Sequence, residues 1–327
     1  MLHIIYRIKE SDTMIKVFID GSAGTTGLKI YERISSRNNI ELIRLAEDER
    51  KDPKARKAAI FDSDITFLCL PDEAAKEAAE FAAGSNTVII DSSTAHRTDD
   101  MWAYGFPELS GMREKIFSSK RIANPGCHAS GFISLAAPLT ENGIITKDAV
   151  LSCFSITGYS GGGKKMIAEY ESENRNILLD APRMYGLTQA HKHLPEMSKI
   201  CGLENPPLFC PVVAPFYSGM EVTITLAAKD IKGTADDIKD IYRSYYTGGL
   251  VKYAEDISEN GFASASLMSG RDDMIISVYG NNDRILLVSR FDNLGKGASG
   301  AAIQNMNIVL GVNETEGLVT AESEEQI

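Results

Sequence analysis

The sequence predicts a two-domain protein in which an α/β domain with a parallel sheet precedes an α+β domain with a mixed sheet. Its 327 residues exceed what one hydrophobic core ordinarily holds, so we expect two cores. Up to residue 124, short apolar runs alternate with segments of helical periodicity, which is typical of βαβ units. After residue 124 the apolar runs are longer and closer together, as in a mixed or antiparallel sheet.

The first domain begins with a predicted strand at residues 15–20 (IKVFID). This strand meets GSAGTTG, and LKIYERI follows with the helical spacing of Leu28, Tyr31 and Ile34. Further strands are predicted at residues 40–45, 64–71 and 87–91, with a helix (DEAAKEAAEFAAG) between the last two. Strands that alternate with helices imply crossover connections and therefore a buried parallel sheet.

The second domain is predicted from four strand-like runs: AVLSCFSITGYSGGGKK, LFCPVVAPFYSGMEVTITLAA, MIISVYG and DRILLVSRF. A helix is predicted at residues 294–311, with small residues first and an apolar face later, and we expect it to pack back on the first domain. The acidic, poorly periodic residues 314–327 predict a frayed tail. Residues 1–13 are expected to be an upstream start or a disordered arm ahead of Met14.

Composition and charge exclude several classes of protein. Hydrophobic residues make up 43% and charged residues 24%, which is typical of a globular protein that folds in water. The net charge of −11 disfavours a nucleic acid or an anionic membrane as partner. No stretch approaches the roughly 20 apolar residues that span a bilayer. The five cysteines include no CxxC pair, which favours a reducing compartment, and we expect a cytoplasmic protein.

The glycine turn carries the first indication of a ligand. Gly21, Gly24 and Gly27 lie directly after a predicted strand and at the start of a predicted helix. Glycine lets the backbone approach a pyrophosphate, and the N–H groups at the helix start hold the anion. The pattern therefore favours a Rossmann-type dinucleotide site over a purely structural turn. The other residues of the turn assigned to the cofactor are Ala23, Thr25 and Thr26.

The charged run AEDERKDPKAR after the second strand does not decide which group on the adenosine side of the cofactor is bound. Glu47 or Asp48 is suited to a ribose diol, whereas Arg50 and Lys51 are suited to a 2′-phosphate. A solvated charged loop without a ligand explains the same residues.

Cys127 is the candidate nucleophile because it follows Asn-Pro-Gly and begins a small-residue, apolar run that reads as a helix. The dipole and N–H groups of a helix start raise the thiolate fraction and stabilise an oxyanion. A buried, inert thiol is the alternative. The remaining cysteines, which are Cys69, Cys153, Cys201 and Cys210, are expected to be structural.

Thiolate chemistry also needs a proton donor and acceptor, which points to histidine. His191 and His193 lie two residues apart in QAHKHLPEM, and we assign the acid/base role to His193. Glu196 is spaced to orient a ring on a helix, although Pro195 favours a turn there. No third ligand at zinc-like spacing accompanies the pair, so no metal is expected. For His3, His96 and His128 we expect a hydrogen-bonded or solvated ring.

Six motifs occur in order along the chain: GSAGTTG, DSSTAHR with YGFPEL, NPGCHASG, TGYSGGGKK, HKHLPEM and DNLGKGASGAAIQNMN. Together they make the chain resemble the N-acetyl-γ-glutamyl-phosphate reductase family in its short type. The likeness spans residues 15 to about 311. It implies membership of the superfamily of aspartate-semialdehyde and glyceraldehyde-phosphate dehydrogenases. Three departures lie near the site: His128 where an aromatic residue or Asn is more usual, Ser130 for Thr, and Thr157 for Ser.

The resemblance implies NADP(H), arginine biosynthesis, a thioester on Cys127, and an acid/base histidine in HKHLPEM. It divides the chain into an NADP-binding domain at 14–125, completed by 294–313, and a glyceraldehyde-phosphate-dehydrogenase-like catalytic and dimerisation domain at 126–293. It also implies a homo-oligomer, a dimer or tetramer, that takes a small anionic acyl phosphate and releases inorganic phosphate.

Further residues are assigned to the two ligands. The cofactor candidates outside the glycine turn and the charged run are Ser92, Asn293 and Lys296. The substrate carries a carboxylate and a phosphate, so basic and backbone donors must line its pocket. The substrate candidates are Ser160, Gly161, Lys164, Arg97, Arg183 and His191, with Lys165 and Lys192 as further bases.

Two rival interpretations stay open from sequence. Aspartate-semialdehyde dehydrogenase shares the glycine turn and the cysteine nucleophile, but HKHLPEM and YGFPEL favour the reductase. A non-catalytic NADP-binding sensor with a buried Cys127 is the alternative from a different class.

Overall fold

The computed structural model describes residues 14–321 and divides the chain into two compact units. Unit 1 contains residues up to 125 together with 298–318, and unit 2 contains residues 126–297 and those from 319 onward. The expected leader at 1–13, with His3, and the last six residues of the expected tail lie outside the described residues. Within the described range, no helix combines the length and apolar character needed to cross a bilayer.

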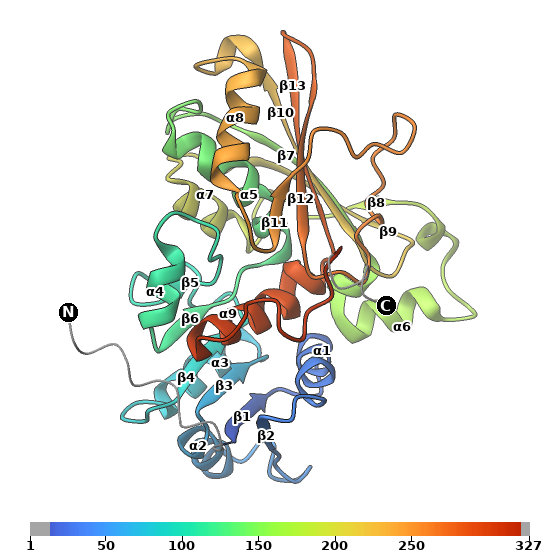
Figure 1. Cartoon of the computed structure of the whole chain (residues 1–327). Coiled ribbons are helices and arrows are strands. Elements are labelled where there is room, and N and C mark those ends of the chain that lie inside the picture. The colour runs from blue at the N-terminus through green and yellow to red at the C-terminus, as the bar shows by residue number, and fades with distance from the viewer. Residues whose placement is uncertain (1–13, 322–327) are drawn as a thin grey trace, which may run out of the picture. The chain divides into compact units, whose positions relative to one another are not determined.

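Unit 1 is built on a parallel sheet, as the alternating pattern predicts. In the described residues the six strands have the order β2-β1-β3-β4-β6-β5, and every neighbouring pair is parallel. Figure 1 shows this sheet with its flanking helices. The strands are β1 (Ile15–Asp20), β2 (Ile40–Ile43), β3 (Ile65–Leu68), β4 (Val88–Asp91), β5 (Ala103–Tyr104) and β6 (Arg121–Ala123). The sequence pattern does not reveal β5 and β6, because runs of two or three residues carry no periodicity.

The helices of unit 1 are α1 (Thr25–Ile34), α2 (Pro53–Asp62), α3 (Asp72–Phe81), α4 (Met112–Ser118) and α9 (Gly300–Leu310). Helix α2 begins inside the charged run AEDERKDPKAR, where no helix is predicted from the sequence. Asp52 caps this helix by accepting hydrogen bonds from the N–H groups of Lys54 and Ala55, and Pro53 occupies the first turn. Helix α9 packs on α1, α4 and β4 of the same unit.

The described residues of unit 2 form a mixed sheet of seven strands in the order β11-β12-β13-β10-β7-β9-β8. The pairs β7–β9 and β11–β12 are parallel, and the other neighbours are antiparallel. The strands are β7 (Ser152–Gly158), β8 (Arg183–Met184), β9 (Leu208–Ala214), β10 (Met220–Ala227), β11 (Val251–Tyr253), β12 (Met274–Gly280) and β13 (Arg284–Phe291). The helices are α5 (Cys127–Glu141), α6 (Gly163–Glu171), α7 (Leu194–Cys201) and α8 (Ala235–Tyr245).

One face of the unit 2 sheet is covered by α5, and the other carries exposed apolar side chains. Gly131 on α5 allows close packing, because a Cβ there would lie 2.4 Å from Val222 Cγ2 and 2.9 Å from Phe291 Cε1. The strand registers place Phe154, Leu208 and Leu286 together on the opposite face. All three are exposed, Leu208 by 60%.

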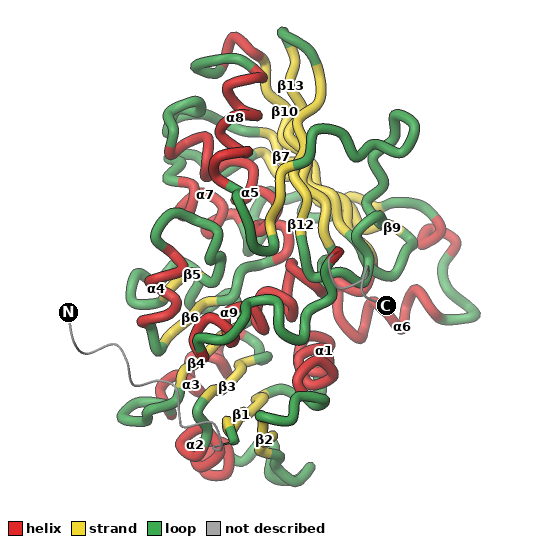
Figure 2. The backbone as a smooth tube through the Cα atoms, viewed as in Figure 1, coloured by secondary structure: helices red, strands yellow, loops and turns green. Residues whose placement is uncertain are grey.

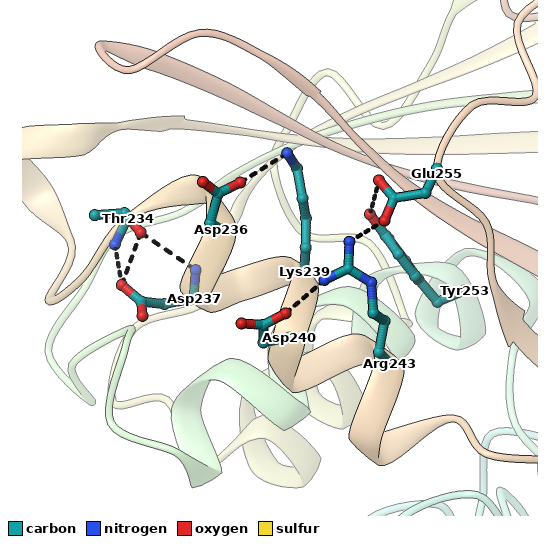
Figure 3. Close-up of polar contacts among 8 residues, drawn as sticks. All are labelled: Thr234, Asp236, Asp237, Lys239, Asp240, Arg243, Tyr253 and Glu255. Carbon is teal, nitrogen blue, oxygen red and sulfur yellow. Dashed lines mark hydrogen bonds and ion pairs between the residues drawn. The ribbon is translucent and has the colours of Figure 1, made fainter.

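Helix α8 shows how local sequence fixes an element of this unit (Figure 3). The Thr234 side chain accepts from the Asp237 N–H while the Asp237 carboxylate accepts from Thr234 N–H, which forms a capping box. Lys239 pairs with Asp236, and Arg243 pairs with Asp240 and Glu255. The buried face of the helix, with Ile238 and Tyr242, supplies most of its stability because exposed ion pairs contribute little.

The region predicted as one helix at 294–311 begins with a π-helical turn, η4 (Gly295–Ser299), before α9 starts. Such turns are rare and frequently occur at functional sites. The described part of the tail is packed rather than frayed: Leu318 and Thr320 are buried, and Val319 exchanges hydrogen bonds with Asp272. The acidic composition of the tail gives no indication of these few packed residues.

Candidate functional site

The glycine turn of unit 1 has the geometry that a pyrophosphate requires. Gly21 has φ of 88°, and a Cβ there would lie 2.3 Å from the Cys69 carbonyl oxygen. A Cβ on Gly27 would lie 2.6 Å from the Gly21 carbonyl oxygen, so both positions need glycine. Helix α1 begins directly after Gly24 with no side-chain cap, and the buried Thr25 Oγ1 has no hydrogen-bond partner within the described residues. These open donors fit a nicotinamide dinucleotide.

A buried ion pair that the sequence does not reveal holds the base of this turn. Asp20, the last residue of β1, accepts a hydrogen bond of 3.0 Å from Arg56 Nε of α2. Arg56 also pairs with Glu77 of α3. Burial raises the pKa of Asp20, although Arg56 acts in the opposite direction. The pair ties α2 and α3 to the end of the strand that leads into Gly21.

The other unit 1 candidates have mixed surroundings. Arg50 and Lys51 are exposed in a turn after β2, and Ser92 follows β4. Arg97 is buried and donates hydrogen bonds to the carbonyl oxygens of Asn124 and Ser92, so it holds backbone of its own unit.

Cys127 is the first residue of α5, in unit 2. Gly126 is the residue at the helix cap, and no side chain caps this end. The cysteine is partly exposed. Gly297 of η4 leaves room beside it, because a Cβ on Gly297 would lie 3.0 Å from the Cys127 Cβ. A thiol in this position feels the helix N-terminus and is open to a reactant.

The other cysteines have different surroundings. Cys153 and Cys201 are buried, and burial raises the pKa of both thiols. Burial also raises the pKa of Cys69 to about 12. Cys210 is half-buried.

Glu196 connects the cysteine helix to the candidate acid/base. Its Oε2 accepts a hydrogen bond of 3.2 Å from the Gly126 N–H, and its Oε1 lies 4.0 Å from His193 Nε2. Both side chains are buried. Pro195 does not prevent this arrangement, because it lies in the first turn of α7, where proline needs no N–H partner.

His128 lies beside His191 and His193, a proximity that the sequence does not indicate. Its Nδ1 lies 2.7 Å from Ser155 Oγ and its Nε2 lies 2.6 Å from Tyr185 Oη. The ring is 5.7 Å from the ring of His191 and 5.6 Å from that of His193. The expectation of a hydrogen-bonded ring is confirmed, but its place beside the candidate acid/base is visible only in three dimensions.

His191 and His193 pack edge to face with ring centroids 4.8 Å apart. His191 Nδ1 accepts a hydrogen bond of 3.2 Å from the His193 N–H. Burial and the neighbouring Lys192 lower the pKa of His191, so its ring is neutral near pH 7. Figure 2 shows that the chain between α6 and α7, which carries these histidines, is mostly loop apart from a short turn and β8.

A second group of polar side chains joins the end of β7 to the end of β13. Asn293 donates from Nδ2 to Ser160 Oγ at 3.0 Å and accepts from the Gly219 N–H at 2.9 Å. Gly161 follows in the turn η1 (Tyr159–Gly162), and a Cβ there would lie 3.5 Å from Asn293 Nδ2. Lys296, in η4, is fully buried.

The remaining bases of unit 2 differ in exposure. Lys164, Lys165 and Lys192 are exposed. Arg183 lies over the Tyr170 ring, with its guanidinium carbon 5.3 Å from the centroid, and donates to the Tyr170 hydroxyl at 3.0 Å. Its Nε is buried without a hydrogen-bond partner in residues 14–321. No group of three or more His, Cys, Asp or Glu side chains in those residues is arranged to hold a metal ion.

Comparison with known proteins agrees with both units. Residues 16–119 match the family described as semialdehyde dehydrogenase, NAD binding domain, and residues 127–293 match its dimerisation domain. The chain is 17% identical to aspartate semialdehyde dehydrogenase II from Vibrio cholerae, with a TM-score of 0.71 over 91% of this chain and 99% of that one. A likeness at that identity concerns the fold, which is that of the semialdehyde dehydrogenase class.

Curated relatives are more specific. The chain is 42% identical to N-acetyl-gamma-glutamyl-phosphate reductase 2 of Nostoc sp., over 93% of this chain and 99% of the relative. It is 41% identical to N-acetyl-gamma-glutamyl-phosphate reductase of Brucella ovis, over 90% and 99%. The chain belongs to the N-acetyl-gamma-glutamyl-phosphate reductase family.

Proposed function

We propose that this chain reduces N-acetyl-γ-glutamyl phosphate to N-acetylglutamate 5-semialdehyde and inorganic phosphate, with NADPH, in arginine biosynthesis. The activity follows from the family, and the observation that best supports the route through a thioester is the partly exposed Cys127 at the uncapped start of α5. Cys153 and Cys201 are buried, so neither thiol is accessible for attack on the acyl carbon of a substrate or for release of the product.

The cofactor is NADP(H), and unit 1 is its binding domain. Gly21, Gly24 and Gly27 with the start of α1 would hold the pyrophosphate, where Thr25 Oγ1 offers a further polar atom. The bound cofactor supplies the hydride that reduces the acyl carbon. Arg50 and Lys51 are exposed and free to meet a 2′-phosphate. Ala23, Thr26, Ser92, Asn293 and Lys296 complete the proposed cofactor set.

Cys127 acts first. Its thiolate attacks the acyl carbon, a C–S bond forms, and the bond from that carbon to the phosphate oxygen breaks, which releases phosphate. The N–H groups at the start of α5 stabilise the oxyanion that develops during attack. After hydride reduction, the C–S bond breaks and the Cys127 thiolate is restored together with the aldehyde.

His193 serves as the acid/base for these steps. It donates a proton to the oxygen that gains charge on reduction and takes the proton back as the aldehyde forms. Glu196 Oε1, 4.0 Å from His193 Nε2, orients the His193 ring, and Oε2 accepts from the Gly126 N–H, so one carboxylate contacts both the acid/base and the residue before the nucleophile. Glu196 is buried because its two partners, the Gly126 N–H and the His193 ring, lie inside the unit.

The substrate's two anionic groups meet donors of unit 2. Arg183 is the strongest candidate, because its buried Nε has an unused donor beside the aromatic Tyr170. Ser160 and Gly161, in the turn that Asn293 fixes, offer hydroxyl and backbone donors, while Lys164 and His191 lie on the same unit. Arg97 is the weakest candidate because its guanidinium already holds two backbone carbonyl groups.

The chain acts as a homo-oligomer, a dimer or tetramer, in the cytoplasm. Residues 127–293, which match a dimerisation domain, include the open face of the unit 2 sheet with Phe154, Leu208 and Leu286. A second copy of this face would bury the three apolar side chains.

The test is the reverse reaction, followed by absorbance of the reduced nicotinamide. N-acetylglutamate 5-semialdehyde, phosphate and NADP⁺ should react rapidly, and NAD⁺ should be a poorer substitute. Aspartate semialdehyde in the same assay addresses the nearest rival enzyme. Preference for aspartate semialdehyde would contradict the proposed substrate. No turnover with either aldehyde, in protein that binds NADP⁺, would favour the sensor.

A further inference from the structure

The loop between β8 and α7, residues 185–193, holds Gln189 in a backbone conformation that side chains rarely adopt. Its φ is 55°, in the left-handed region where residues other than glycine are strained unless their surroundings hold them. The Gln189 N–H donates to the Gly186 carbonyl group at 2.9 Å, which closes a turn. Gln189 is exposed as a whole, yet its amide group reaches back to the sheet. The contacts of that amide group therefore compensate for the strained turn.

The Gln189 amide group takes the place of a strand residue beside β9. Its Nε2 donates to the Phe209 carbonyl group at 2.7 Å, and its Oε1 accepts from the Phe209 N–H at 2.9 Å. A backbone N–H only donates and a carbonyl oxygen only accepts, so the orientation of the amide group is fixed. On this side β9 pairs with only two residues of β8, and Pro211 has no N–H to extend the pairing. Gln189 supplies the next two hydrogen bonds along that edge.

Phe209 joins these hydrogen bonds to the histidines of the site. The residue is 1% exposed, so both of its backbone polar groups need a partner within the protein. Its ring lies edge to face against His191, with centroids 5.0 Å apart, and against His128 at 5.2 Å. His191 Nδ1 in turn accepts from the His193 N–H at 3.2 Å. The loop is therefore attached to Phe209 at two points, Gln189 and His191, directly before His193.

We propose that Gln189 is a positioning residue, which fixes its loop to Phe209 and so sets the place of His191 and, through His191, of the acid/base His193. The inference rests on the proposed role of His193 and adds the residue that holds its loop to the sheet. An acid/base must stay within hydrogen-bond reach of the atom it protonates, so a loop that carries one has to be fixed. Gln189 provides this without touching the reacting groups.

The experiment measures carbethoxylation of histidine by diethyl pyrocarbonate, read by mass spectrometry of tryptic peptides. Cleavage after Lys192 places His191 and His193 on different peptides. The reaction requires neither acyl phosphate nor NADP(H), so failure of this proposal is distinguishable from failure of the proposed enzyme activity. Gln189→Met keeps the side-chain length without the amide and should raise the rates at both histidines about tenfold, because the loop opens more often without its two hydrogen bonds. His96, in unit 1, should react at the wild-type rate.

Two further variants separate loss of the hydrogen bonds from the strained backbone, and they carry the test if Gln189→Met does not fold. Gln189→Gly removes the strain together with the amide, and Gln189→Asn tolerates the positive φ but has a shorter side chain. Both should react as Gln189→Met does. Thr188→Ala, at the exposed neighbour in the same loop, should react as wild type. Wild-type rates in any Gln189 variant, or an equal rise at His96 or in Thr188→Ala, would overturn the proposal.

The reverse reaction gives a second readout, one that general loosening of the fold would not reproduce. Gln189→Met should lower kcat about tenfold, because His193 is less often in place to transfer a proton. The KM for NADP⁺ should stay at the wild-type value, since Gln189 does not belong to the proposed cofactor set. An unchanged kcat, or a rise in the KM for NADP⁺ that accounts for the whole loss, would contradict a positioning role.

Discussion

Two buried side chains, Glu196 and His128, define the chemistry of the candidate site at the scale of single residues. Glu196 reaches both the Gly126 N–H and the ring of His193, so a charged group ties the acid/base to the start of α5. His128 is neutral and binds only uncharged partners, Ser155 and Tyr185. Glu196 therefore contributes a carboxylate to the site, whereas His128 contributes hydrogen bonds from an uncharged ring.

The low pKa of His128 predicts a pH dependence of stability. The unfolded chain takes up a proton on this ring below about pH 6.5, whereas the folded protein takes it up only near pH 3. Between these values the unfolded state binds more protons, so stability falls as pH falls, with a slope of up to about 1.4 kcal/mol per pH unit from this group. Urea unfolding of wild type and His128→Gln at several pH values measures it: the variant should show the shallower slope. Equal slopes would mean that His128 does not remain neutral in the fold.

At the scale of elements, helix α5 carries the nucleophile and depends on a close approach to the sheet. Gly131 lies one turn after Cys127, where any side chain would collide with Val222 and Phe291. The same small-residue pattern that makes the helix hard to read from sequence allows this approach. The position of the thiol therefore depends on the packing of α5 against β10 and β13 as well as on its own turn.

Gly131→Ala should destabilise the protein by about 1 to 3 kcal/mol, because the added methyl group must displace packed side chains. Activity should fall as well, since the helix start moves with the helix. Gly248→Ala is the matched control: nothing lies within 4 Å of its added Cβ, so its unfolding midpoint should stay close to that of wild type. If the two variants unfold at the same urea concentration, α5 does not rely on glycine at 131.

Sequence predicts the elements with strong local signals and misses those that depend on distant contacts. The strand before Gly21 and the helix after it are found because glycine punctuation and periodicity agree there. Helix α2 is missed because its charged residues outweigh two start signals, Asp52 and Pro53. The contacts of His128 cannot be read from sequence at all, because its partners come from β7 and the chain after β8.

At the scale of the whole molecule, the domains are not continuous in sequence. Helix α9 and the residues after it to 318 return to unit 1, where Asn305 donates to the Gly105 carbonyl group and Asn307 accepts from Arg37. Unit 2 in turn leaves one sheet face open with exposed apolar residues. A later segment of the same chain therefore adds a helix to unit 1, and we expect another copy of the chain to cover the exposed sheet face of unit 2.

Phe154→Asp should weaken the oligomer, because a carboxylate on the open face must be desolvated when two copies meet. Sedimentation velocity should show a shift from the oligomer toward the 35.6 kDa monomer. Met101→Asp, at an exposed site of unit 1, should keep the wild-type mass. A Phe154→Asp protein that sediments as wild type would place the interface elsewhere.

The central claim is a covalent thioester on Cys127, and rapid mixing with acid quench tests it most directly. Protein without NADPH is mixed with N-acetyl-γ-glutamyl phosphate, quenched, digested and examined by mass spectrometry, with Cys127→Ser and Cys153→Ser as controls. We predict an N-acetylglutamyl adduct on the Cys127 peptide of wild type and Cys153→Ser, and no thioester in Cys127→Ser, together with a loss of several orders of magnitude in its turnover. An adduct on a different residue, or undiminished turnover in Cys127→Ser, would contradict the mechanism.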